Sequence, residues 1–192
     1  LHATNVYLVQ PNLNLYLDSL GYDGFHSGYM ISFMNLAKII ACFVFSYWTT
    51  FSYKHPYICC TILTLLSNIV YVFASNSNYA YQLILISRFM IGFGSAKLVH
   101  KRLTIEYSTF YNLFFYAAML MVMENLGRAS GPLLDMILSS FLIENNSTES
   151  FIYPTLIFSI VWILVLLYIL MFFKDPIDIK NDYESIHSIS IN

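Results

Sequence analysis

Apolar residues in this chain gather in long blocks, and short polar stretches separate the blocks. Six blocks can be marked, at roughly 1–20, 27–50, 57–74, 79–100, 111–143 and 152–173. A block of about 20 apolar residues has the length of a helix that crosses the hydrocarbon core of a bilayer, whereas the strands of a membrane barrel would give short alternating segments. The pattern therefore predicts an all-α integral membrane protein: a bundle of six transmembrane helices over 1–173, then a polar tail or linker over 174–192. Because the chain opens on Leu1 with the first block already under way, we expect that block to be truncated, and Pro11 should kink it.

Composition supports a membrane protein in contact with the lipid bilayer. Hydrophobic residues make up 58% of the 192 residues and charged residues only 10%, against about 25% in soluble domains. The net charge is −2, and no basic cluster interleaved with aromatic residues is present, so nucleic acid is not an expected partner.

The basic residues outside the blocks predict an orientation. They fall in alternate connections, at Lys54, Lys101, Arg102, Lys174 and Lys180. The other connections, 21–26, 75–78 and 144–150, contain no lysine or arginine. The positive-inside rule places the first set, and with it the tail, in the cytosol. The overlapping sequons at Asn145 and Asn146 fall on the opposite side, where glycans are added.

Six ionisable residues fall within the predicted spans. The basic ones are Lys38, Arg88, Lys97 and Arg128, and the acidic ones are Glu124 and Asp135. Ionisable residues in a membrane span are candidate functional residues by default, and an excess of positive charge at low dielectric attracts anions. The alternative is that Lys38 and Arg128 pair with Glu124 and Asp135 and hold helices together.

The fourth block carries the main candidate site. On one continuous helix, Arg88, Ser95 and Arg102 lie within about 40° of one another, with Lys97 on the opposite face and Lys101 one turn further on. We expect Arg88 and Arg102 to attract an anion. Lys97 and Lys101 either concentrate the anion at the cytosolic mouth or pack against a neighbouring helix.

Small residues and one proline mark close contacts between helices. Gly92 and Gly94 in the fourth block, and Gly127 and Gly131 in the fifth, permit another helix to approach. Pro132 removes a backbone donor and bends the helix. The sequence leaves open whether this second group is a packing motif or a hinge.

No arrangement typical of catalysis stands out. The sequence contains no recognisable Ser-His-Asp set, phosphate-binding loop or group of metal-ligating residues. We therefore predict that the protein is not an enzyme and that it uses no metal and no cofactor.

Two motifs resemble a known family. Arg88-x-x-x-Gly92-x-Gly94-Ser95-Ala96 is similar to the fourth-helix motif of the major facilitator superfamily (MFS), and Gly127-x-x-x-Gly131-Pro132 to its fifth-helix motif. Within that superfamily, the run from Arg88 to Arg102 resembles the vacuolar phosphate transporters that carry an SPX domain, with lysines at 97 and 101 in place of arginines. The lysosomal member linked to ceroid lipofuscinosis is similar too.

The resemblance implies a function. It implies an N-terminal half of a twelve-helix protein, packed against a C-terminal bundle, that moves a small inorganic anion (phosphate or chloride) across a vacuolar or lysosomal membrane. The mechanism would be that of an alternating-access or channel-like carrier. Two alternatives stay open: a proton-coupled transporter of organic solutes that uses Glu124, and a degenerate, non-transporting interaction protein.

Overall fold

A computed structural model describes residues 1–11, 13–74, 77–95, 97–142 and 153–175. These residues form helices and no strand, which confirms the all-α fold. The helices are α1 (His2–Val9), α2 (Leu13–Ser19), α3 (Phe25–Trp48), α4 (Lys54–Ala74), α5 (Ala80–Phe93), α6 (Lys97–Tyr107), α7 (Phe110–Leu142) and α8 (Tyr153–Phe172). The predicted glycosylation sites, Asn145 and Asn146, lie outside the described residues.

Among the described residues, three helices are long and apolar enough to cross a membrane: α3, α4 and α8. Their bounds lie within three residues of the second, third and sixth predicted blocks. Many of their large apolar side chains are exposed, such as Ile160, Leu164 and Met171 of α8. Exposed apolar surface of this extent suits contact with lipid rather than water.

Two predicted spans are divided into two helices each. The first block gives α1 and α2, with Pro11 between them, because proline supplies no backbone N–H to continue a helix. The fourth block gives α5, a short apolar helix, and α6, which begins at Lys97, and the described residues Gly94 and Ser95 between them are not helical. The prediction of one continuous helix over 79–100 was wrong. Glycine's low helix propensity accounts for a break at this point.

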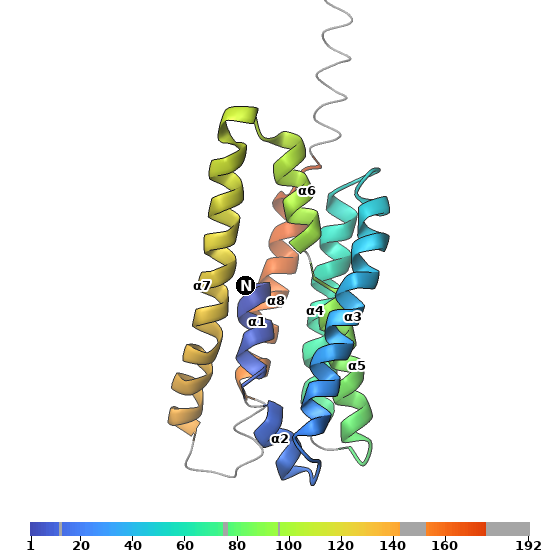
Figure 1. Cartoon of the computed structure of the whole chain (residues 1–192), viewed down its shortest axis with the longest axis vertical. Helices are drawn as coiled ribbons and strands as arrows, with labels where there is room; N and C mark the ends of the chain where they lie inside the picture. The colour runs from blue at the N-terminus through green and yellow to red at the C-terminus, as the bar shows by residue number, and fades with distance from the viewer. Residues whose placement is uncertain (12, 75–76, 96, 143–152, 176–192) are drawn as a thin grey trace, which may run out of the picture.

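The helices run side by side along the long axis of the molecule (Figure 1). On one side α5 packs against both α3 and α4, and on the other α1 packs against α7. Helix α8 lies mainly against α4 and also contacts α1 and α7. A buried amide pair joins the two groups: Asn5 Nδ2 donates to Asn68 Oδ1 at 3.1 Å, and Asn68 Nδ2 returns a hydrogen bond to Asn5 Oδ1 at 3.4 Å. This pairing gives both buried amide side chains hydrogen-bond partners in place of water.

Glycines mark where α5 meets its neighbours. A Cβ on Gly92 would overlap the carbonyl oxygen of Met34 in α3. A Cβ on Gly94 would lie 3.0 Å from the carbonyl oxygen of Cys60 in α4. Only a residue without a side chain allows these backbones to approach so closely.

Glycines also allow α7 to pack closely against α1. A Cβ on Gly127 would lie 3.0 Å from the Cβ of Ala3, and one on Gly131 would lie 2.8 Å from the carbonyl carbon of Tyr7. The described helix continues through Pro132. In this structure the glycines of α7 therefore form a packing surface for α1.

Candidate functional site

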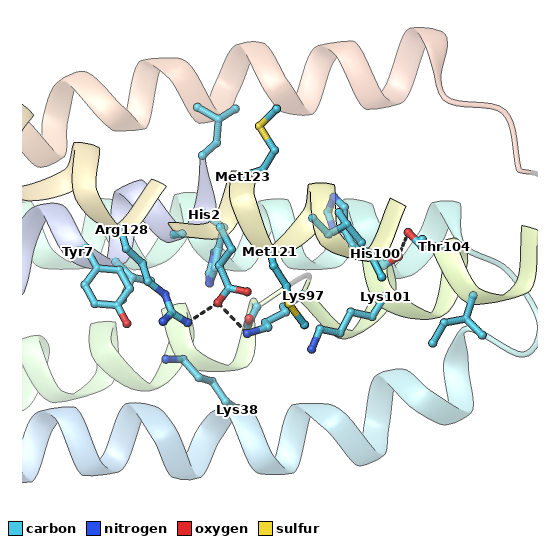
Figure 2. A pocket seen from close by; sticks show the side chains of 18 residues that line it. His2, Tyr7, Lys38, Lys97, His100, Lys101, Thr104, Met121, Met123 and Arg128 are labelled. Carbon is cyan, nitrogen blue, oxygen red and sulfur yellow. Dashed lines mark hydrogen bonds and ion pairs between the residues drawn. The ribbon is translucent and has the colours of Figure 1, made fainter. Parts of the chain in front are cut away.

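A cavity of about 520 Å³ opens between α1, α3, α6 and α7 (Figure 2). Four of its lining residues are cations: Lys38 from α3, Lys97 and Lys101 from α6, and Arg128 from α7. Glu124 is the one carboxylate among the described residues that line it. Apolar side chains such as Val6 and Met121 form much of the remaining wall. The cavity thus has a marked excess of positive charge.

Helical spacing explains how α6 contributes. Lys97, His100, Lys101 and Thr104 recur at intervals of three and one along the helix, so they share one face, and all four line the cavity. Arg102 falls outside this stripe. Once α6 is known to begin at Lys97, helical spacing alone groups these four residues on one face.

Glu124 is held by two cations from different helices. Its Oε1 atom accepts a hydrogen bond from Lys97 Nζ of α6 at 2.7 Å and another from Arg128 Nη2 of its own helix at 2.5 Å. The Arg128 guanidinium also lies 5.6 Å from the centroid of the Tyr7 ring in α1, which favours a cation over the ring face. Of the pairings expected from the sequence, the structure therefore contains Arg128 with Glu124.

The other two cavity cations have no carboxylate partner among the described residues. Lys38 Nζ donates to Asn35 Oδ1 at 3.1 Å, one turn away on its own helix. Lys101 lines the cavity from α6, one turn beyond Lys97. Asp135 is buried, nearer the C-terminal end of α7 than Glu124 and Arg128. Within the described part of the chain, it is not among the cavity-lining residues.

Arg88 lies apart from this cavity. Its side chain is only 4% exposed, and its guanidinium carbon sits 4.8 Å from the centroid of the Tyr71 ring of α4. It borders a separate void of about 10 Å³, together with Gln10 and Met34. Its Nε atom has no hydrogen-bond partner among the described residues.

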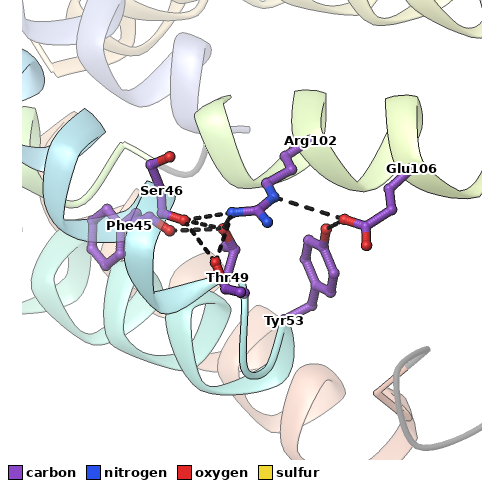
Figure 3. Close-up of polar contacts among 7 residues, drawn as sticks. Phe45, Ser46, Thr49, Tyr53, Arg102 and Glu106 are labelled. Atoms are coloured by element: carbon purple, nitrogen blue, oxygen red, sulfur yellow. Dashed lines mark hydrogen bonds and ion pairs between the residues drawn. The ribbon is translucent and has the colours of Figure 1, made fainter. Parts of the chain in front are cut away.

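Arg102 caps the C-terminal end of α3 (Figure 3). Its Nη1 atom donates to the carbonyl oxygen of Ser46 and to Thr49 Oγ1, the latter at 2.8 Å. The last carbonyl groups of a helix lack partners within the helix and carry partial negative charge, so a guanidinium stabilises them. The expected shared face of Arg88 and Arg102 does not form, because the two residues lie on separate helices.

A second contact fixes this end of α6. Arg102 Nε lies 3.7 Å from Glu106 Oε2, one turn away. The Tyr53 hydroxyl donates a hydrogen bond to the same Glu106 oxygen. Burial, together with this hydrogen bond, raises the pKa of the Tyr53 phenol, so it stays protonated and available as a donor.

Sequence reasoning also missed part of the cavity wall. His2 and Tyr7 of α1 line it, and the His2 ring packs edge-on against Trp162 of α8 with centroids 6.4 Å apart. The apolar pattern of the first block gave no signal for this. Their place depends on how α1 is inserted between α7 and α8, which the glycines of α7 permit.

Comparison with known proteins identifies the family. The profile described as Major Facilitator Superfamily matches residues 1–187, and the chain belongs to that superfamily, whose members are membrane transporters. An SPX domain-containing membrane protein of Arabidopsis thaliana is 29% identical over 98% of this chain and 26% of its own length. A rice homologue with the same description (Oryza sativa subsp. japonica) is 28% identical over 92% of this chain and 25% of its own length.

These matches confirm the resemblance to the SPX-containing subgroup. A further Arabidopsis thaliana relative with that description is 26% identical over 96% of this chain. The chain spans about a quarter of the length of these relatives. The superfamily match and the apolar helices show a multi-pass integral membrane protein.

Proposed function

We propose that this chain forms the N-terminal bundle of a carrier that moves a small inorganic anion, phosphate or chloride, across a membrane. The observation that carries the proposal is the cavity between α1, α3, α6 and α7, in which four cations face one carboxylate. Superfamily membership supports movement of the bundle against a C-terminal partner bundle around a central site.

Electrostatics favours an anion in this cavity. Its walls are partly apolar, and a low local dielectric strengthens the attraction between a fixed cation and a mobile anion. Lys101 and Lys38 are proposed as the first contacts of the anion, because neither lysine forms an ion pair with a described carboxylate. Lys97 and Arg128 are proposed as the second pair of contacts.

The two arginines predicted from the sequence receive different roles. Arg88 is proposed as an anion contact in a different conformation of the carrier, since its buried Nε lacks a partner among the described residues. Arg102 is assigned to holding α6 on the end of α3, because three of its contacts are with the last turn of that helix and the two residues after it.

The membrane arrangement is part of the proposal. We propose six spans, with α1–α2 and α5–α6 each acting as one broken span, and with Lys54, Lys174 and the tail in the cytosol. Asn145 and Asn146 are proposed glycosylation sites on the opposite side. We propose a vacuolar or lysosomal membrane as the location, and the likeness to the SPX-containing subgroup supports this proposal.

Uptake into proteoliposomes tests the anion-carrier proposal. The full-length protein is reconstituted, and saturable uptake of labelled phosphate and of labelled chloride is recorded with and without a membrane potential. Lys101→Gln should lower uptake of the transported anion about tenfold, the change expected from losing roughly 1.4 kcal/mol of charge attraction. Lys54→Gln, which removes a lysine outside the cavity, serves as the matched control and should leave uptake unchanged. Uptake that is equal in the two variants would contradict the proposed site.

A second candidate is proton-coupled transport of an organic solute. The apolar part of the cavity wall and the presence of Glu124 beside it favour this alternative. Such a carrier would show uptake of an organic solute driven by a pH gradient and lost in Glu124→Gln, with no saturable uptake of phosphate or chloride.

A further inference from the structure

One carboxylate oxygen lies where two cations of the cavity converge. Glu124 Oε1 accepts hydrogen bonds from Lys97 Nζ and from Arg128 Nη2 (Figure 2). The two cations come from different helices, α6 and α7. Any oxygen or halide anion that entered the cavity would seek this same point, because it offers two donors and two positive charges at once.

We infer that Glu124 is an internal competitor that occupies the anion subsite between Lys97 and Arg128 until an incoming anion displaces it. This inference rests on the proposed anion-carrier function and names the regulation of the same site. In the empty state Glu124 neutralises part of the positive charge and ties α6 to α7. In the loaded state the transported anion takes over both contacts.

The surroundings of Glu124 favour this exchange. The side chain is 24% exposed at the wall of the cavity, and Lys97 and Arg128 are 47% and 45% exposed. A carboxylate at a cavity wall can swing away without leaving a buried charge unpaired, which is the costly outcome for a fully buried pair. Displacement replaces one anion with another and therefore preserves the local charge balance.

The remaining charged and titratable groups of the cavity define the order of events. His2 lies on α1, Lys38 on α3, and His100 and Lys101 on α6. Since no described carboxylate pairs with Lys38 or Lys101, these two lysines are open to an entering anion. The anion is then passed to the Lys97–Arg128 subsite as Glu124 leaves it.

The alternative role for Glu124 is that of a positioning residue that holds Lys97 and Arg128 in place for the anion. The two roles give opposite results when the charge is removed. If Glu124 competes, Glu124→Gln binds the anion more tightly. If Glu124 positions the cations, the same variant binds it more weakly.

Equilibrium binding of inorganic phosphate and of chloride to the purified full-length protein provides the test. Glu124→Gln should lower the dissociation constant of the bound anion about tenfold, whereas Glu124→Asp, which keeps the charge, should not tighten binding. Asp18→Asn is the matched control, because it removes one negative charge from an exposed position on α2, outside the cavity. Its dissociation constant should equal that of the unmodified protein.

Two further arms keep the outcome decisive. Should Glu124→Gln fail to fold, carbodiimide labelling of Glu124 in the unmodified protein replaces it: labelling should rise when chloride replaces gluconate. Weaker binding in Glu124→Gln, or labelling of Glu124 that chloride leaves unchanged, would overturn the inference.

If neither the unmodified protein nor Glu124→Gln binds phosphate or chloride, the proposed function itself fails. Binding that is lost in Lys101→Gln but not tightened in Glu124→Gln would leave the function standing and reject only the competitor role.

Discussion

At the scale of single residues, equal charges have different roles according to what surrounds them. Lys101 and Arg102 are neighbours in sequence, yet Lys101 lines the cavity and Arg102 caps α3. Successive residues on a helix point about 100° apart, and on α6 this rotation directs Lys101 to the cavity and Arg102 to the end of α3. A basic pair in the sequence is therefore two separate sites in the structure.

The Arg102 cap leads to a prediction about stability. Arg102→Gln removes the charged donor from the end of α3 and should lower the free energy of unfolding by about 1.5–3 kcal/mol, the range for hydrogen bonds that involve a charged group. Thermal melting of the detergent-purified protein measures this effect. The dissociation constant of the anion should change less than about twofold, because a twofold change corresponds to only about 0.4 kcal/mol. Lost anion binding with unchanged melting would instead return Arg102 to the anion site.

At the scale of helices, close contacts decide which elements build the cavity. Gly127 and Gly131 allow α1 to lie against α7, and this contact brings the side chains of α1 to the cavity wall. The break at Gly94 and Ser95 has a comparable effect, since it lets α6 present Lys97 and Lys101 independently of the direction in which Arg88 points from α5.

The α1–α7 contact predicts a difference between two glycine variants. Gly131→Ala places a Cβ 2.8 Å from the backbone carbon of Tyr7, so the helices must separate, at a cost of about 1–3 kcal/mol. Gly28→Ala in α3 meets nothing within 4 Å and should be neutral or stabilising by up to about 1 kcal/mol, because alanine favours a helix. Melting curves of the two variants make the comparison. An equal gain of stability in both variants would show that helix propensity, and not the α1–α7 contact, dominates.

At the scale of the whole molecule, the residues that follow α3, α6 and α8 gather at one end (Figure 1). Asp175, just after α8, accepts hydrogen bonds through Oδ2 from Ser52 Oγ at 2.6 Å, from the Tyr53 backbone N–H at 2.8 Å and from the Lys54 backbone N–H at 3.1 Å. The α3–α4 connection and the residues after α8 are thus joined. The α6–α7 connection lies at the same end (Figure 1). This arrangement agrees with the side on which the sequence places the lysines.

The shared end predicts which positions react from which side of the membrane. In a variant with Cys42, Cys59 and Cys60 replaced by alanine, a cysteine introduced at exposed Thr109 should react with a membrane-impermeant maleimide only from the cytosolic side. A cysteine introduced at exposed Asn78 should react only from the opposite side. Labelling of sealed vesicles of known orientation distinguishes the two. Labelling of both from one side would contradict the proposed topology.

The apolar pattern by itself determined the class of protein and most helix positions. The blocks at 27–50, 57–74 and 152–173 became α3, α4 and α8 with nearly the same bounds, because a long apolar run has few alternatives to a buried or lipid-facing helix. The small residues at 92, 94, 127 and 131 marked close helix contacts for a similarly local reason. The motifs around them also gave the superfamily.

Only the tertiary structure decided which charges meet. Arg88 and Arg102 would share a face only on one continuous helix. The break before Lys97 places them on separate helices. Glu124 could be paired with Lys38 or Arg128 from the sequence, and the fold paired it with Arg128 and Lys97. Sequence periodicity fixes directions within one helix, but a cavity is made by several helices. Their relative rotation follows from contacts between residues far apart in the chain.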